Sequence, residues 1–102
     1  MTISRDEIIS RLTIMRPEIQ TDFGIDIFGL IGSQARGDSH SDSDVDIAYE
    51  RIAGRVVTLV HLGGVLNRVS EALNMSIDLV DWTALNPNYK DMMQKDLVRF
   101  YG

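Results

Sequence analysis

Three aspartates occupy positions where acidic residues are uncommon. Asp44 and Asp46 lie two residues apart in the segment 44–49, whose alternation of polar and apolar residues predicts a β-strand. Because side chains alternate across a strand, both carboxylates project from one face, with Cα atoms ~6.6 Å apart. Asp78 lies in a second apolar segment, 75–82, which also predicts a strand. If these strands are neighbours, the three carboxylates converge on one place.

Such a group of carboxylates is unfavourable unless a cation or protons offset its charge. Two carboxylates ~5 Å apart repel each other by roughly 3 kcal/mol at an effective dielectric constant of about 20. Oxygen ligands without His or Cys favour Mg²⁺ or Mn²⁺ over zinc, and two such ions can clamp the oxygens of a phosphoryl displacement. Taken singly, each aspartate also fits a structural role: a turn cap for Asp44, a solvated strand face for Asp46 and a sheet edge for Asp78.

The segment before these acids fits a phosphate-binding turn. Gly32 and Ser33 follow the apolar stretch 25–31, which predicts a buried strand. The Ser33 hydroxyl and the neighbouring amides can donate to phosphate oxygens, and Arg36 adds a permanent cation suited to phosphate. The turn is neither a Walker A loop nor a dinucleotide-binding GxGxxG turn. Ten residues separate Ser33 from Asp44, and this spacing is far more specific than a Gly-Ser pair alone.

The elements that must position these residues are expected in the order αββαβα, a small α/β (α+β) domain over residues 1–102. A helix is predicted over residues 5–15. Pro17 should then break or kink it and begin a further turn that ends near Phe23 and Gly24.

Two more helices are predicted, over residues 55–73 and 89–100. The first carries leucine and valine at steps of three and four and ends at Asn74. Gly63 and Gly64 inside it cost roughly 1 kcal/mol each relative to Ala. The last helix places its apolar face on Met93, Leu97 and Phe100.

Other residues that could take part in chemistry have simpler expected roles. His40 is expected in a solvated loop and His61 in packing or at the surface of a helix. Met92 and Met93 are expected in the core, although methionine-rich faces also suit partner binding.

Composition excludes several classes of function. The 102 residues carry a net charge of −5 and no cysteine, so disulfides, thiolate metal sites and cysteine nucleophiles are absent. An acidic balance disfavours binding of extended nucleic acid. No apolar run approaches the ~20 residues of a membrane span, and the first residues show no signal-peptide core, so no membrane contact and a cytoplasmic location are expected.

Two segments, GSQARGD at 32–38 and SDVDI at 43–47, resemble the signature of the DNA polymerase β-type nucleotidyltransferase superfamily. Within it, the chain most resembles the minimal nucleotidyltransferases, short prokaryotic proteins often encoded beside a HEPN-domain partner. The stretch Ile77–Val80 matches the family's third-carboxylate strand. The resemblance covers most of the chain and implies a small mixed sheet flanked by helices.

The resemblance also implies a mechanism. Gly32 and Ser33 would hold the triphosphate of a nucleotide, and Asp44 and Asp46 would bind two Mg²⁺ ions. Asp78 would help bind the catalytic metal and assist removal of a proton from an acceptor hydroxyl. AMP from ATP would pass to that hydroxyl. In related antitoxins the acceptor is a tyrosine of the HEPN toxin, so the resemblance implies a hetero-oligomer and an antitoxin.

Two other functions stay open. One is a binding module that masks a toxin by stoichiometric contact alone. The other is a nucleotidyltransferase for a small hydroxylated molecule such as an aminoglycoside; such relatives usually carry an additional domain for the acceptor, for which this chain leaves no residues.

Overall fold

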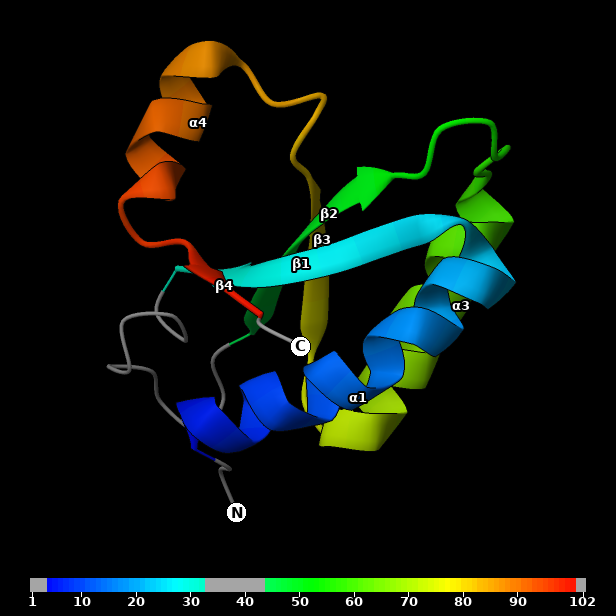
Figure 1. Cartoon of the computed structure of the whole chain (residues 1–102). Helices are drawn as coiled ribbons and strands as arrows, with labels where there is room; N and C mark the ends of the chain where they lie inside the picture. Colours follow the sequence, from blue (N-terminus) through cyan, green and yellow to red (C-terminus); the bar gives the residue numbers. More distant parts are fainter. Residues whose placement is uncertain (1–3, 33–43, 101–102) are drawn as a thin grey trace.

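The computed structural model describes residues 4–32 and 44–100, and within them a mixed four-stranded sheet carries helices on both faces (Figure 1). In chain order the elements are α1 (Arg5–Phe23), β1 (Ile25–Ile31), β2 (Val45–Arg51), α3 (Leu59–Leu73), β3 (Ile77–Asp81), α4 (Pro87–Gln94) and β4 (Val98–Arg99). The strand order is β3-β2-β1-β4. β2 and β3 run parallel, whereas β1 is antiparallel to both β2 and β4. The predicted α/β class with a small mixed sheet is confirmed.

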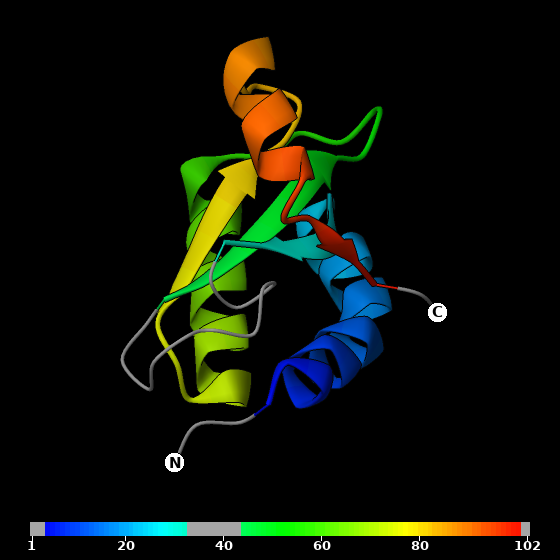
Figure 2. The same ribbon diagram turned by 90° about the vertical axis from the view of Figure 1, so that its left-hand side faces the viewer.

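The two faces of the sheet have separate apolar clusters. α1 and α3 pack side by side on one face, and α4 lies on the other side of the sheet (Figures 1 and 2). The larger cluster, between the sheet and α1 and α3, includes the fully buried Ile8, Leu12, Ile47, Val65 and Val69. The smaller cluster, on the α4 side, is built from Phe28, Ile31, Ala48 and Trp82.

β1 has the predicted bounds and contains a β-bulge. Its register with β2 shifts between Ile27 and Gly29. Ile27 belongs to the larger cluster and so does Leu30, three positions further on, where uninterrupted alternation would have placed Gly29. Ile31 therefore belongs to the smaller cluster and pairs with Asp46 of β2.

The helix expected to break at Pro17 is continuous. α1 runs through Pro17 and ends at Phe23, where Gly24 caps it with a left-handed φ of 75°. Leu12 and Ile19, on either side of the proline, are fully buried. Their packing against the sheet outweighs the loss of the one backbone hydrogen bond that Pro17 cannot donate.

α3 begins later than expected, at Leu59, because Thr58 caps it. The Thr58 hydroxyl accepts from the His61 amide, and His61 Nδ1 accepts from the Thr58 amide at 3.0 Å. His61 thus has a structural role in this cap. The predicted end at Asn74 is confirmed, with φ at 53°.

Gly64 has a packing role that its helix propensity does not suggest. A Cβ at Gly64 would lie 2.5 Å from Cε1 of Phe23, whereas a Cβ at Gly63 would meet nothing within 4 Å. Gly64 therefore allows α1 and α3 to approach each other closely.

The helix predicted over residues 89–100 is wrong in its second half. α4 ends at Gln94, and Val98 pairs with Leu30 in the short strand β4. Leu97 packs against the smaller cluster and Phe100 is buried in the larger one, on the opposite face of the sheet. The observed order is αββαβαβ, because edge pairing with β1 stabilises the last turn as a strand. None of the helices in the described ranges is long and apolar enough to cross a membrane.

Candidate active site

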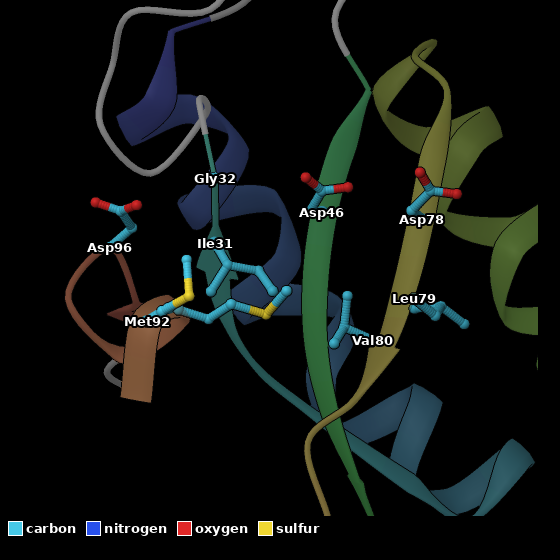
Figure 3. A pocket seen from close by; sticks show the side chains of 9 residues that line it. Ile31, Gly32, Asp46, Asp78, Leu79, Val80, Met92 and Asp96 are labelled. Atoms are coloured by element: carbon cyan, nitrogen blue, oxygen red, sulfur yellow. The ribbon is translucent and has the colours of Figure 1, made fainter. Parts of the chain in front are cut away.

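Asp46 and Asp78 occupy paired positions on neighbouring parallel strands. Asp46 of β2 lies opposite Asp78 of β3 in the register, and both carboxylates point to the same side of the sheet (Figure 3). The prediction that these two strands are neighbours is confirmed. Asp44 immediately precedes β2 and is exposed. The site therefore forms where β2 and β3 begin.

The site concentrates negative charge. Burial raises the pKa of Asp46, and the carboxylates of Asp78 and Asp44 raise it further. Within residues 4–32 and 44–100, no ion pair joins any of these three aspartates to a basic side chain. A divalent cation would offset this charge.

The donor set fits magnesium held jointly with a substrate. In the described part of the chain, no group of three His, Cys, Asp or Glu is placed to hold a metal ion on its own. Mg²⁺ in phosphoryl-transfer sites is commonly held by one or two carboxylates together with substrate phosphates and water. Asp46 and Asp78 supply two hard oxygen donors of that kind.

Gly32 lies beside Asp46, on the side away from Asp78 (Figure 3). Its φ is 77°, and a Cβ on it would lie 2.9 Å from Oδ2 of Asp46. Glycine is therefore needed both for the backbone conformation and for the space that the carboxylate fills. Ser33, Arg36 and His40 lie outside the described residues, so their expected roles stay predictions.

A pocket of about 470 Å³ opens beside the two carboxylates (Figure 3). It lies on the face of the sheet that carries α4. Its walls are formed by Ile31, Gly32, Asp46, Asp78, Leu79, Val80, Met92, Met93 and Asp96.

The contribution of α4 to this pocket was missed at the level of sequence. Met92 and Met93 were expected in the core. Met93 does pack against the smaller cluster, but Met92 is 68% exposed and faces the pocket (Figure 3). Helical spacing could not have shown this, because α4 ends at Gln94 and Asp96 lies in the turn that follows it.

Comparison with known proteins identifies the family. No protein-family model matches the sequence. The chain is 30% identical over 98 residues to the protein adenylyltransferase MntA of Thermococcus cleftensis, covering 94% of this chain and 95% of that protein. The chain belongs to the MntA family of nucleotidyltransferases.

Solved structures agree with this MntA-family fold. A minimal nucleotidyltransferase superposes with a TM-score of 0.75 at 21% identity, covering 94% of this chain and 95% of the other. A toxin–antitoxin complex with AMP-PNP contains a chain that superposes with a TM-score of 0.67 at 21% identity, covering 98% of this chain and 74% of the other. The fold and the enzyme class implied by the sequence resemblance are confirmed.

Proposed function

We propose that this MntA-family nucleotidyltransferase transfers AMP from ATP to a tyrosine hydroxyl of a partner HEPN toxin, with Mg²⁺, and so acts as an antitoxin. The observation that carries this proposal is the pairing of Asp46 with Asp78 at the mouth of a pocket whose size suits a nucleotide. The concentrated negative charge at these residues gives a nucleotide-bound cation a place to bind.

Each residue of the site has a distinct task in this reaction. Asp44, Asp46 and Asp78 would hold Mg²⁺, which neutralises charge on the phosphoryl oxygens when bound. Gly32 and Ser33 would hold the triphosphate. Asp78, on the edge strand β3, accepts the proton of the acceptor hydroxyl. A bond forms between that oxygen and the α-phosphorus, the bond from the α-phosphorus to the bridging oxygen breaks, and pyrophosphate leaves.

The relatives support the choice of donor and acceptor. The relative from Thermococcus cleftensis is named a protein adenylyltransferase, which favours AMP as the group and a protein as the acceptor. The structural neighbour solved with AMP-PNP is a toxin–antitoxin complex, which favours a toxin as that protein. The tyrosine is the acceptor that the family resemblance implies.

The test is transfer of label from ATP labelled at its α-phosphate. The purified chain is incubated with Mg²⁺, labelled ATP and the product of the adjacent gene, the proposed toxin. Label should appear on the toxin, should disappear when the acceptor tyrosine is replaced by Phe, and should be lost with Asp46→Asn. Asp81→Asn is the matched control, because Asp81 lies at the opposite end of β3 and pairs with Arg51; it should retain transfer.

A toxin-neutralisation assay of the same variants, together with the label transfer, separates the other functions. If Asp46→Asn still neutralises the toxin fully, the protein acts by stoichiometric contact and its catalysis is dispensable. If label passes to a small hydroxylated molecule and never to the toxin, the acceptor assignment is wrong.

A further inference from the structure

The pocket beside Asp46 has two kinds of wall. Asp46 and Asp78 form a carboxylate end. Ile31, Val80 and Met92 contribute apolar side chains to the remainder, and Asp96 lies at its edge beside Met92 (Figure 3). A volume of about 470 Å³ lies in the range of about 300–1,000 Å³ found for sites that bind small molecules and cofactors. A ligand with a cation-bound anionic group at one end and a flat apolar group at the other would match these walls.

The apolar wall lies on one definite side of the carboxylates. In Figure 3, Gly32 and Met92 lie on one side of Asp46 and Asp78 lies on the other, as the strand order β3-β2-β1-β4 requires. In an in-line displacement the attacking and leaving oxygens stand on opposite sides of the phosphorus. Gly32 belongs to the turn proposed for the triphosphate, and Asp78 is the residue proposed for the acceptor. The leaving pyrophosphate therefore lies on the Gly32 side, away from Asp78. The nucleoside is a lateral substituent of the α-phosphorus, and its place follows from the apolar residues that line the pocket.

Met92 is a large apolar residue that is exposed to solvent. Its side chain is 68% exposed, and it lines the pocket that also contains the carboxylates of Asp46 and Asp78. A flexible, polarisable thioether packs well against aromatic rings of different shapes. Met93, the next residue, lines the same pocket and is anchored on the smaller apolar cluster.

We propose that Met92 and Met93 form the wall that holds the nucleoside part of the donor nucleotide by apolar contact. This inference rests on the proposed function, because it assumes that the pocket takes a nucleoside triphosphate. Since contact area grows with ring size, a purine gains more from this wall than a pyrimidine does.

The experiment compares two ligands that differ only by the nucleoside. Binding of Mg–ATP and of Mg–tripolyphosphate is measured by calorimetry for the wild type, Met92→Ala and Tyr89→Ala. Tyr89 is a matched control, because it is 59% exposed on the same helix and is not among the residues that line the pocket. Met92→Ala should weaken Mg–ATP about fivefold to tenfold and leave Mg–tripolyphosphate unchanged, while Tyr89→Ala should change neither.

Each other outcome overturns the inference in a recognisable way. Equal weakening of both ligands by Met92→Ala would mean that the effect does not act through the nucleoside. Unchanged Mg–ATP binding together with weakened toxin binding would assign the α4 wall to the acceptor protein. If the wild type binds Mg–tripolyphosphate but not Mg–ATP, the pocket does not accept a nucleoside; if it binds neither, the proposed function fails as well.

Discussion

The backbone of Gly32 lies against the carboxylate of Asp46, so that a Cβ at Gly32 would stand 2.9 Å from Oδ2 of Asp46. The glycine proposed to hold the triphosphate therefore leaves the space that the Asp46 carboxylate fills. A side chain at Gly32 must displace that carboxylate.

Gly32→Ala should therefore impair activity more than its effect on folding suggests. The positive φ of 77° costs a non-glycine residue about 1–2 kcal/mol, and the new methyl group would also push the Asp46 carboxylate away. We expect AMP transfer to fall by about 100-fold or more, the effect of misplacing a reacting group by ~1 Å. Steady-state kinetics with thermal unfolding of the same preparation measures both effects.

Gly54→Ala is the control for this substitution. Gly54 also has a positive φ, 83°, but a Cβ there meets nothing within 4 Å. It should lose similar stability and keep its activity. Equal loss of activity in both variants would mean that backbone strain, rather than contact with Asp46, causes the defect.

Asp46→Asn should stabilise the protein in the absence of metal. The substitution removes one negative charge from a half-buried group of carboxylates, so unfolding at pH 7 in EDTA should cost more free energy, by up to about 1 kcal/mol after solvent screening. Stabilisation by bound Mg–ATP should differ in the opposite direction, with the wild type gaining more than the variant. Mg–ATP at about 100 times its Kd adds about 2.7 kcal/mol to the wild type and should add far less to the variant. A destabilised Asp46→Asn in EDTA would contradict the charge balance described for the site.

Asp26 should make the stability of the fold depend on pH in the acid range. Burial raises the pKa of Asp26, but hydrogen bonds from Arg16 at 2.6 and 2.9 Å and from Gln20 at 2.8 Å lower it by more, so the net shift is downward. A carboxylate with a depressed pKa contributes stability above its ordinary pKa of about 3.9, and that contribution is lost as pH falls through the folded-state pKa.

Asp26→Asn should accordingly lose about 1–3 kcal/mol at pH 7, with a smaller difference from the wild type at pH 2. Glu18→Gln serves as the comparison, since Glu18 forms an exposed pair with Arg68 and should cost less than about 1 kcal/mol. Chemical denaturation across pH measures both. A loss for Asp26→Asn that is the same at pH 2 and pH 7 would show that the charge of Asp26 is not its cause.

The two adjacent glycines of α3 should respond to alanine with opposite signs. Gly63→Ala meets open space and should stabilise the protein by about 0.5–1 kcal/mol through helix propensity. Gly64→Ala places a methyl group 2.5 Å from the Phe23 ring and should destabilise it by about 1–3 kcal/mol. Thermal unfolding of the pair is the measurement. Stabilisation by both substitutions would show that α1 can move away from α3 at little cost.

The parts of the fold that local pattern determines could be predicted from the sequence. The alternation around Asp46 correctly predicted a strand there, although β2 begins at Val45 and leaves Asp44 just before it, and the apolar run 25–31 matches the bounds of β1. Both patterns depend on burial of neighbouring side chains, which leaves a direct signature in the sequence.

The parts that depend on distant partners could not be predicted in this way. β4 has two residues and exists because Val98 pairs with Leu30, far away in the chain, so the helical spacing of Met93, Leu97 and Phe100 gave a wrong prediction. For the same reason, nothing in the sequence placed Met92 beside Asp46. The fold of α4 back over the sheet brings them to one pocket.

The bulge in β1 also limits how this chain can change in length. Residues on either side of it face the same core although they are three positions apart. Deletion of one residue at the bulge, between Ile27 and Gly29, would restore simple alternation and leave Ile31 on its present face. Deletion of Leu30, beyond the bulge, would instead move Ile31 into the helix-covered core and carry Gly32 away from its place beside Asp46. The active site therefore depends on the number of residues between the bulge and Gly32 as much as on their identity, and indels there should be less tolerated than substitutions.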